Sequence, residues 1–129
     1  MPIVDIMRKI LVKSGCKTFE AEVYDNKVAD EFMERLPISV HFGKDATGYF
    51  SSMDEKLYGR AKKDRWFTAG DIAICNNVSL SVFVEQFAPK KHFVKVGHIA
   101  NPEILDKIIE MNSGEVIFDF FDEKIPAIA

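Results

Sequence analysis

Alternation of apolar and polar residues marks the first third of the chain. Phe19, Ala21 and Val23 alternate with charged and hydroxyl-bearing residues, and a Ser14-Gly15 pair separates this run from an apolar run before it. Successive side chains of a strand point to opposite faces, so the pattern predicts two strands joined as a hairpin.

Two segments change to helical spacing. The first, residues 25–37, offers Asp25 or Asn26 as N-cap, and the second, residues 101–114, opens with Asn101 in that position. Their apolar stripes are Val28, Ala29, Phe32, Met33 and Leu36 in the first and Ile104, Leu105, Ile108 and Ile109 in the second. Each segment is therefore predicted to be an amphipathic helix, ended by Pro37 or Gly114.

Further strands are predicted where alternation returns. They fall at residues 38–42, 48–53, 72–75, 78–84, 92–99 and 115–121, with residues 43–70 holding a long irregular connection. In the run 78–84, Ser81 and Phe83 face away from the side that carries Leu80 and Val82. About seven strands against two helices, with short turns between them, indicate a closed or nearly closed antiparallel barrel whose ends the helices plug.

The length and charge of the chain narrow the choice of class and partner. A chain of 129 residues fits one domain, so we expect residues 1–129 to form a single unit. The net charge is -3, which gives no general attraction to nucleic acid or to an anionic membrane. We therefore expect a small molecule or peptide as partner, and we leave open whether the protein forms a homo-oligomer. The basic run at residues 59–65 is expected to be a solvated surface loop.

The first residues match neither a signal peptide nor a membrane span, because charges interrupt their apolar run, and we expect a cytoplasmic protein. Pro2 would become an N-terminal secondary amine if Met1 were removed, as in tautomerases. Those enzymes, however, follow that strand with a long helix, whereas this chain continues into a hairpin.

Metal, cofactor and nucleophile signals are weak. Cys16 and Cys75 lack metal-binding spacing and are expected to be reduced, packed thiols. The three histidines, His41, His92 and His98, have no ligand spacing either, so no metal and no cofactor is expected. No nucleophile motif indicates hydrolysis.

Several short motifs occur in a fixed order along the chain: a helix ending in "RLP", a strand running into "GYFSS", the run "AGDIAICNNVSLSVFVEQF", and "KVGHI" before the second helix. This order of elements resembles the bacterial and archaeal cyclophilin-like domain proteins. It extends from about Arg8 to Phe120 and implies a mainly β, closed antiparallel cyclophilin-like barrel of about eight strands with two capping helices.

True cyclophilins are peptidyl-prolyl isomerases, and the resemblance can be followed residue by residue. In their F-H-R core the His corresponds to His41, but Phe42 stands where the catalytic Arg is expected. An isomerase needs a donor aimed at the twisted amide, and here only Arg60, Arg65 or Lys44 could supply one from loops. The resemblance also places Phe83 at the aromatic position of the proline pocket, in agreement with its place in the alternation.

These readings converge on a groove that binds a small molecule or peptide. Its expected lining is His41, Tyr49, Phe50, Ser81 and Phe83. We expect prolyl isomerase activity to be weak or absent, so whether the protein is an enzyme is left open. The rival functions are an isomerase using a non-standard Arg and a protein-interaction barrel without a small ligand. Trp66-Phe67, in the long connection, is expected to plug the core beneath it.

Overall fold

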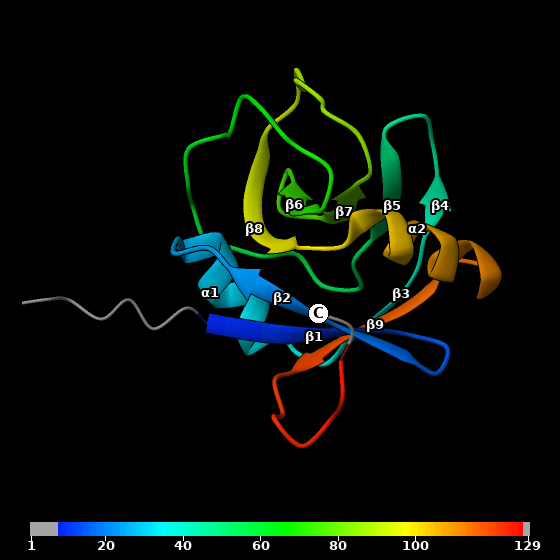
Figure 1. Cartoon of the computed structure of the whole chain (residues 1–129). Coiled ribbons are helices and arrows are strands. Elements are labelled where there is room, and N and C mark those ends of the chain that lie inside the picture. Colours follow the sequence, from blue (N-terminus) through cyan, green and yellow to red (C-terminus); the bar gives the residue numbers. More distant parts are fainter. Residues whose placement is uncertain (1–7, 128–129) are drawn as a thin grey trace, which may run out of the picture.

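The computed structural model describes residues 8–127 as a strongly curved sheet with two helices (Figure 1). The strands are β1 (Arg8–Ser14), β2 (Lys17–Val23), β3 (Ile38–His41), β4 (Gly43–Lys44), β5 (Gly48–Ser52), β6 (Asp71–Cys75), β7 (Ser79–Phe83), β8 (Phe93–Ile99) and β9 (Glu115–Phe120), and the helices are α1 (Lys27–Glu34) and α2 (Pro102–Met111). The tautomerase reading of Pro2 lies outside the described residues.

One continuous antiparallel sheet has the order β3-β9-β1-β2-β8-β6-β7-β5-β4. Its first and last strands, β3 and β4, are separated only by Phe42, so the two ends of the sheet adjoin and the barrel is nearly closed. This confirms the predicted fold class. The described chain has nine strands rather than about eight, because Gly43 and Lys44 pair with Phe50 and Tyr49, a contact that their local pattern does not reveal.

Two tight turns lie where the sequence predicts them. The β1–β2 hairpin turns at Gly15, whose φ is +60°, and the β6–β7 connection turns at Asn76 and Asn77, with φ of 49° and 62°. Consecutive left-handed residues match the twist of a two-residue hairpin, and asparagine adopts that conformation more readily than most residues.

Both helices cover the interior of the barrel. The side chain of Asn26 caps α1 by accepting a hydrogen bond of 2.8 Å from the backbone N–H of Ala29. The helices bury Val28, Ala29 and Phe32 from α1, and Leu105 and Ile109 from α2. They lie on opposite sides of the strands in Figure 1 and contribute to the same core, as expected of barrel plugs. Between residues 8 and 127, no helix has the length and apolarity needed to cross a bilayer.

A second, smaller hydrophobic cluster lies outside the barrel. On β7, Leu80 and Val82 belong to the barrel core, whereas Phe83 joins Phe67 and Ala73 in a separate cluster. This confirms the predicted facing of the strand. The outer face of β6 and β7 is therefore apolar as well, because the connections before β6 and after β7 fold over it.

Two expectations are wrong in part. Phe67 is fully buried beneath the long connection, as predicted, but Trp66 is 52% exposed. Phe67 forms an isolated antiparallel bridge with Phe87, and in extended backbone the neighbouring side chain points the opposite way. Both cysteines are free, but Cys16 is exposed rather than packed because it follows Gly15 in the hairpin turn.

Candidate functional site

A cavity of about 630 Å³ opens on the outer face of β5, β6 and β7. Its aromatic walls are Phe50, Phe83, Phe87 and Phe93. Ser79 and Ser81 add hydroxyl groups, and Cys75 adds a thiol. An apolar hollow of this size with a few polar groups is typical of small-ligand sites.

Strand register explains how the cavity forms. Phe50 on β5 lies opposite Ser81 on β7, and Gly48 lies opposite Phe83. A Cβ atom at Gly48 would stand 2.2 Å from the carbonyl oxygen of Val82, so only glycine permits this close approach of the two strands. Phe50 and Ser81 consequently lie side by side on the outer face.

Phe83 forms the buried end of the cavity. Its ring centroid lies 4.9 Å from that of Phe67 and 5.5 Å from those of Phe87 and Phe93. A ring that lines an open groove would be expected to face solvent in part, but the ring of Phe83 is only 3% exposed. Residues 84–92 fold back over the outer face of β7, where Phe87 pairs with Phe67.

Tyr49 joins the cavity wall to the barrel core. It lines the cavity yet is 3% exposed, and its hydroxyl donates a hydrogen bond of 2.5 Å to Oδ1 of Asp106 on α2. Burial, followed by the hydrogen bond to Asp106, raises the pKa of Tyr49 well above its ordinary value. Lys44 forms ion pairs with Glu110 and Asp106 on the same helix, and its hydrogen bonds to Glu110 and then Asp106 raise the pKa of Lys44. The Tyr49 hydroxyl therefore positions α2, and the exposed wall is Phe50, at 49% exposure.

The structure brings four of the five expected site residues together. Tyr49, Phe50, Ser81 and Phe83 all line this cavity. His41 lies elsewhere, exposed on β3 opposite Glu115 of β9, and its part in ligand binding stays a prediction.

The sequence reading missed the contribution of the connection between β7 and β8. Phe87, Pro89, Lys90, Lys91 and Phe93 all line the cavity. Phenylalanines at 83, 87 and 93, so close together around a charged loop, were the available signal, because large apolar rings in such a segment favour tertiary burial.

Phe42, at the position where the resemblance expects Arg, points into the barrel. It is 4% exposed and packs against Tyr49 and Phe118, with ring centroids 6.0 and 6.1 Å away. None of Arg60, Arg65 and Lys44 lines the cavity either, and Lys44 is held by α2. The cavity walls thus lack a guanidinium donor.

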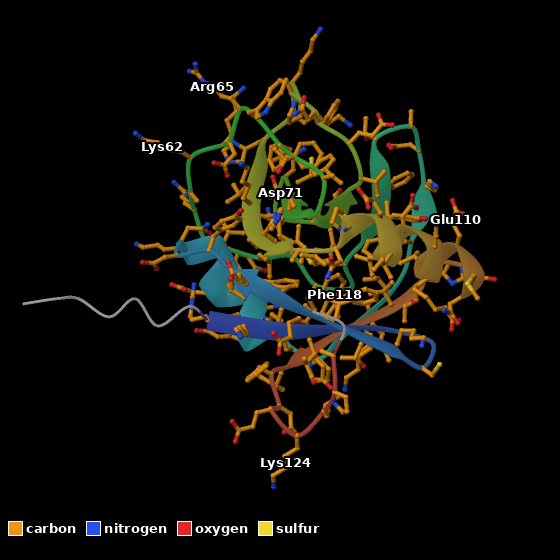
Figure 2. The ribbon with its side chains drawn as sticks, in the orientation of Figure 1. Lys62, Arg65, Asp71, Glu110, Phe118 and Lys124 are labelled. Atoms are coloured by element: carbon orange, nitrogen blue, oxygen red, sulfur yellow. The ribbon has the colours of Figure 1, made fainter. Side chains whose placement is uncertain are left out.

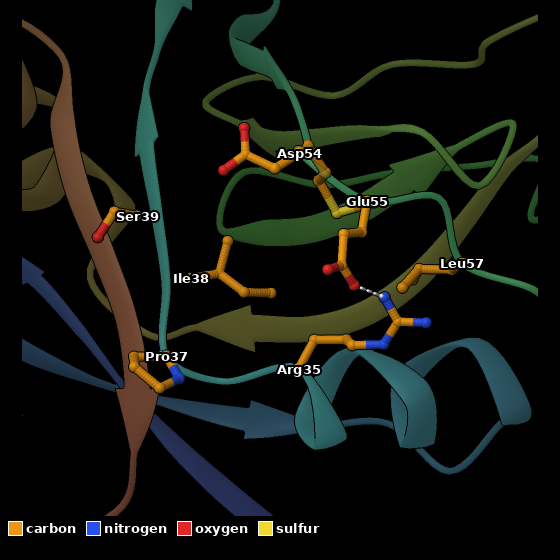
Figure 3. A pocket seen from close by; sticks show the side chains of 8 residues that line it. Arg35, Pro37, Ile38, Ser39, Asp54, Glu55 and Leu57 are labelled. Atoms are coloured by element: carbon orange, nitrogen blue, oxygen red, sulfur yellow. Dashed lines mark hydrogen bonds and ion pairs between the residues drawn. The ribbon is translucent and has the colours of Figure 1, made fainter.

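A second hollow of about 370 Å³ lies at the seam of the barrel, between β3 and residues 53–57. Figure 3 shows Arg35 and Glu55 meeting across it, and their ion pair measures 2.5 Å. Arg35 also pairs with Glu31 at 2.8 Å, so its charge is neutralised from two sides. With no aromatic wall, this hollow is the weaker ligand site.

A buried carboxylate, Asp71, forms the centre of a further polar cluster. Asp71 is 1% exposed and accepts a hydrogen bond of 2.9 Å from the backbone N–H of Thr68. His98 Nδ1 lies 2.9 Å and Lys95 Nζ 3.6 Å from its two oxygens. The Tyr24 hydroxyl donates to it over 3.4 Å; burial, followed by the charge of Asp71, raises the pKa of Tyr24 to about 12. Asp71, the first residue of β6, thus contacts β8 and the residue that follows β2.

Metal-ligand geometry is absent from residues 8–127: no three His, Cys, Asp or Glu side chains among them come together as a metal site would require.

The nearly closed antiparallel barrel with two helices and an aromatic cavity on its outer face defines a small barrel of the cyclophilin type. A sequence model of the cyclophilin-like family matches residues 12–120, most of the chain, and the chain belongs to that family. No curated protein and no solved structure matches it.

Proposed function

We propose that this cyclophilin-like protein binds a small molecule or peptide in the aromatic cavity, acts in the cytoplasm, and has little or no prolyl isomerase activity. The observation that carries the proposal is the set of phenylalanines around the cavity, with Phe50 half-exposed above Phe83. Burying an apolar ring against such walls is favourable by about 1 kcal/mol or more per aromatic contact pair.

Weak or absent isomerase activity is proposed because the cavity wall has no guanidinium donor. A rotating prolyl amide needs a donor aimed at its nitrogen, and Phe42 fills the corresponding place with an apolar ring inside the core. Lys90 and Lys91 are the cations that line the cavity, and a flexible ammonium does not present the planar, fixed donors of a guanidinium.

The test uses 2-naphthamide, a neutral ring probe, and backbone amide chemical shifts. We expect saturable shifts at residues of the cavity wall, and a Phe50→Ala variant that binds at least about fivefold more weakly. Phe120→Ala is the matched control, because Phe120 is 54% exposed and lies outside the cavity. Equal binding by the two variants, or no shifts in the wild type, would reject the proposal.

A protein-interaction barrel is the second candidate, favoured by one observation. Ile117, Phe120 and Phe121, at and just beyond the end of β9, are 40% to 54% exposed. Neighbouring exposed apolar residues are typical of association surfaces. A hydrodynamic mass of a dimer that Phe120→Ala converts to a monomer would support self-association, and a monomer at high concentration would exclude it.

A further inference from the structure

Charge is distributed unevenly along this chain. Two loops, residues 56–65 and 90–91, contain Lys56, Arg60, Lys62, Lys63, Arg65, Lys90 and Lys91 but a single acid, Asp64. Since the whole chain has 17 basic and 20 acidic residues, the remainder has ten basic and nineteen acidic. The net charge of -3 therefore combines two loops with a net charge of +6 and a remainder with a net charge of -9.

The two loops lie together beside the cavity. The carbonyl oxygen of Ala61 lies 3.0 Å from His92 Nε2, and the backbone N–H of Asp64 donates to the carbonyl of Phe93 over 2.8 Å. The Asp64 carboxylate accepts a further bond of 2.8 Å from the backbone N–H of Lys95. The long basic loop is thus fixed against the strand that supplies the Phe93 wall.

The positive charge of this region is not neutralised within the described chain. Ion pairs between residues 8 and 127 involve Arg8, Lys9, Lys13, Arg35, Lys44 and Lys95, and none of them involves the seven basic residues of the two loops. Lys62 and Arg65 extend away from the ribbon into solvent in Figure 2. Unpaired cations beside a low-dielectric hollow attract anions to it.

The charges on the cavity itself have the same sign. Lys90 and Lys91 line it, with Asp45 as the acid of its wall. Asp45 Oδ1 already accepts hydrogen bonds from the backbone N–H of Thr47 at 2.8 Å and of Gly48 at 3.0 Å. Burial acts to raise the pKa of Asp45, but these hydrogen bonds outweigh it and hold the pKa below its ordinary value. This carboxylate is committed to its turn, whereas the two ammonium groups remain available.

The influence of Lys91 extends to the cavity floor. Burial raises the pKa of the Cys75 thiol, and the charge of Lys91 acts against that rise. Cys75 lines the same cavity as Phe50 and Phe83. Lys91 lines this cavity as well, so a cation and the aromatic rings face the same space.

We propose that the cavity selects ligands in which an apolar ring carries a carboxylate, the ring lying between Phe50, Phe87 and Phe93 and the carboxylate facing Lys90 and Lys91. This inference rests on the proposed binding function and adds the sign of charge to it. Both a small aromatic acid and a peptide with acidic residues next to an aromatic one contain this chemistry. A nucleic acid, in contrast, would use the basic loops without the aromatic cavity.

Three probes with one ring separate charge from apolar binding: 2-naphthoate, 2-naphthamide and 2-naphthylmethylamine. We expect naphthoate to bind about three- to tenfold more tightly than the amide, and the amine more weakly than either. The preference should shrink as salt rises, because partly exposed charges are screened. Binding of the amide tests the proposed function alone. If the amide binds and the other two probes match it, the proposed function holds and the charge selection is rejected.

Variants then assign the preference to residues. In a Lys90→Glu, Lys91→Glu double variant, naphthoate should lose its advantage over the amide, and the amine should gain one. Lys124→Glu is the matched control, because Lys124 lies on the far side of the molecule from Lys62 and Arg65 in Figure 2 and makes no cavity contact. An unchanged naphthoate preference in the double variant, or an equal loss in the control, would overturn the assignment.

Two further arms identify the source of the carboxylate. A Glu-Phe-Glu peptide that competes with naphthoate, while a Lys-Phe-Lys peptide does not, indicates a peptide ligand. Failure of both peptides with naphthoate still bound indicates a small acid. Tight binding of a single-stranded oligonucleotide that Phe50→Ala leaves unaltered, with no preference for naphthoate, would replace the proposal with a nucleic-acid surface.

Discussion

The Tyr49 hydroxyl donates a hydrogen bond of 2.5 Å to Asp106 Oδ1, which joins β5 to α2 at the edge of the barrel core. Removing the hydroxyl in Tyr49→Phe should lower the free energy of unfolding by about 1.5 kcal/mol, as for other hydrogen bonds to charged acceptors. Tyr58→Phe is the control and should change little, because Tyr58 is 74% exposed. Urea denaturation of both variants measures the difference, and equal effects would contradict it.

Val82 and Phe83 offer a test of the two clusters, since these neighbours on β7 are 1% and 3% exposed on opposite faces. Val82→Ala should cost about 2 kcal/mol and Phe83→Ala about 3 kcal/mol, because each leaves a cavity in a packed cluster. Phe83→Leu should stay folded and lose binding of 2-naphthamide. Denaturant melts give the stabilities, and an unchanged stability of Phe83→Ala would contradict burial of its ring.

Prolyl isomerisation should be at least about a hundredfold slower than that catalysed by a true cyclophilin, because the missing donor alone costs that much. Phe42→Arg should not restore activity. It would place a charge in the barrel core, where Phe42 is 4% exposed, and should unfold the protein. A proline-peptide assay with Arg60→Ala and Arg65→Ala as companions tests this. Cyclophilin-like rates that survive both substitutions would refute the expectation.

Tyr24 should make stability depend on alkaline pH. Its pKa is raised from 10.0 to about 12 in the folded protein, so the folded state favours the neutral phenol. The stabilisation is complete below about pH 10 and declines as pH rises toward 12, because the unfolded chain loses its proton first. The stability difference between wild type and Tyr24→Phe should therefore shrink over that range. Urea midpoints measured from pH 9 to 12 check it, and a constant difference would count against the shift.

The two thiols should differ in reactivity. Cys16 is exposed, whereas Cys75 is buried and its pKa is raised by that burial, so less thiolate is present at neutral pH. We expect rapid labelling of Cys16 and slow labelling of Cys75, read by mass spectrometry, with Cys16→Ser as the control that isolates the slow site. Reductant and chelator should leave the melting temperature unchanged. A large shift in melting temperature with reductant would indicate a disulfide, and one with chelator would indicate a metal site; either result would contradict this expectation.

Elements set by local pattern could be predicted from the sequence. The Asn76-Asn77 turn, the Asn26 cap and the opposite facing of Val82 and Phe83 depend on residues within a few positions of one another. The spacing and type of nearby residues are therefore enough to predict these local features.

Features made by distant contacts could not be predicted in the same way. Burial of Phe83 requires Phe67 and Phe87 to arrive from two irregular connections and Phe93 from the start of β8, and no local period marks where such segments fold. For His41, alternation predicts the exposed face of its strand, and the side chain is exposed. Alternation does not show which strand is the neighbour, and β3 pairs with β9, away from the cavity. The basic run at residues 59–65 is visible in the sequence, but its place beside the cavity is not, because contacts with residues 92 and 93 set it.

The separation of the outer aromatic cluster from the barrel interior bears on how members of such a family could diverge. The two clusters meet only through the strands between them, so changes at Phe67, Phe87 or Phe93 alter the cavity walls and leave the inner packing in place. Phe87 sits on a connection, where insertions and exchanges are tolerated best. Substitutions in a single connection can thus change the ligand of the barrel without changing its core. Residues 84–92 are therefore the segment to randomise when selecting variants with altered ligand specificity.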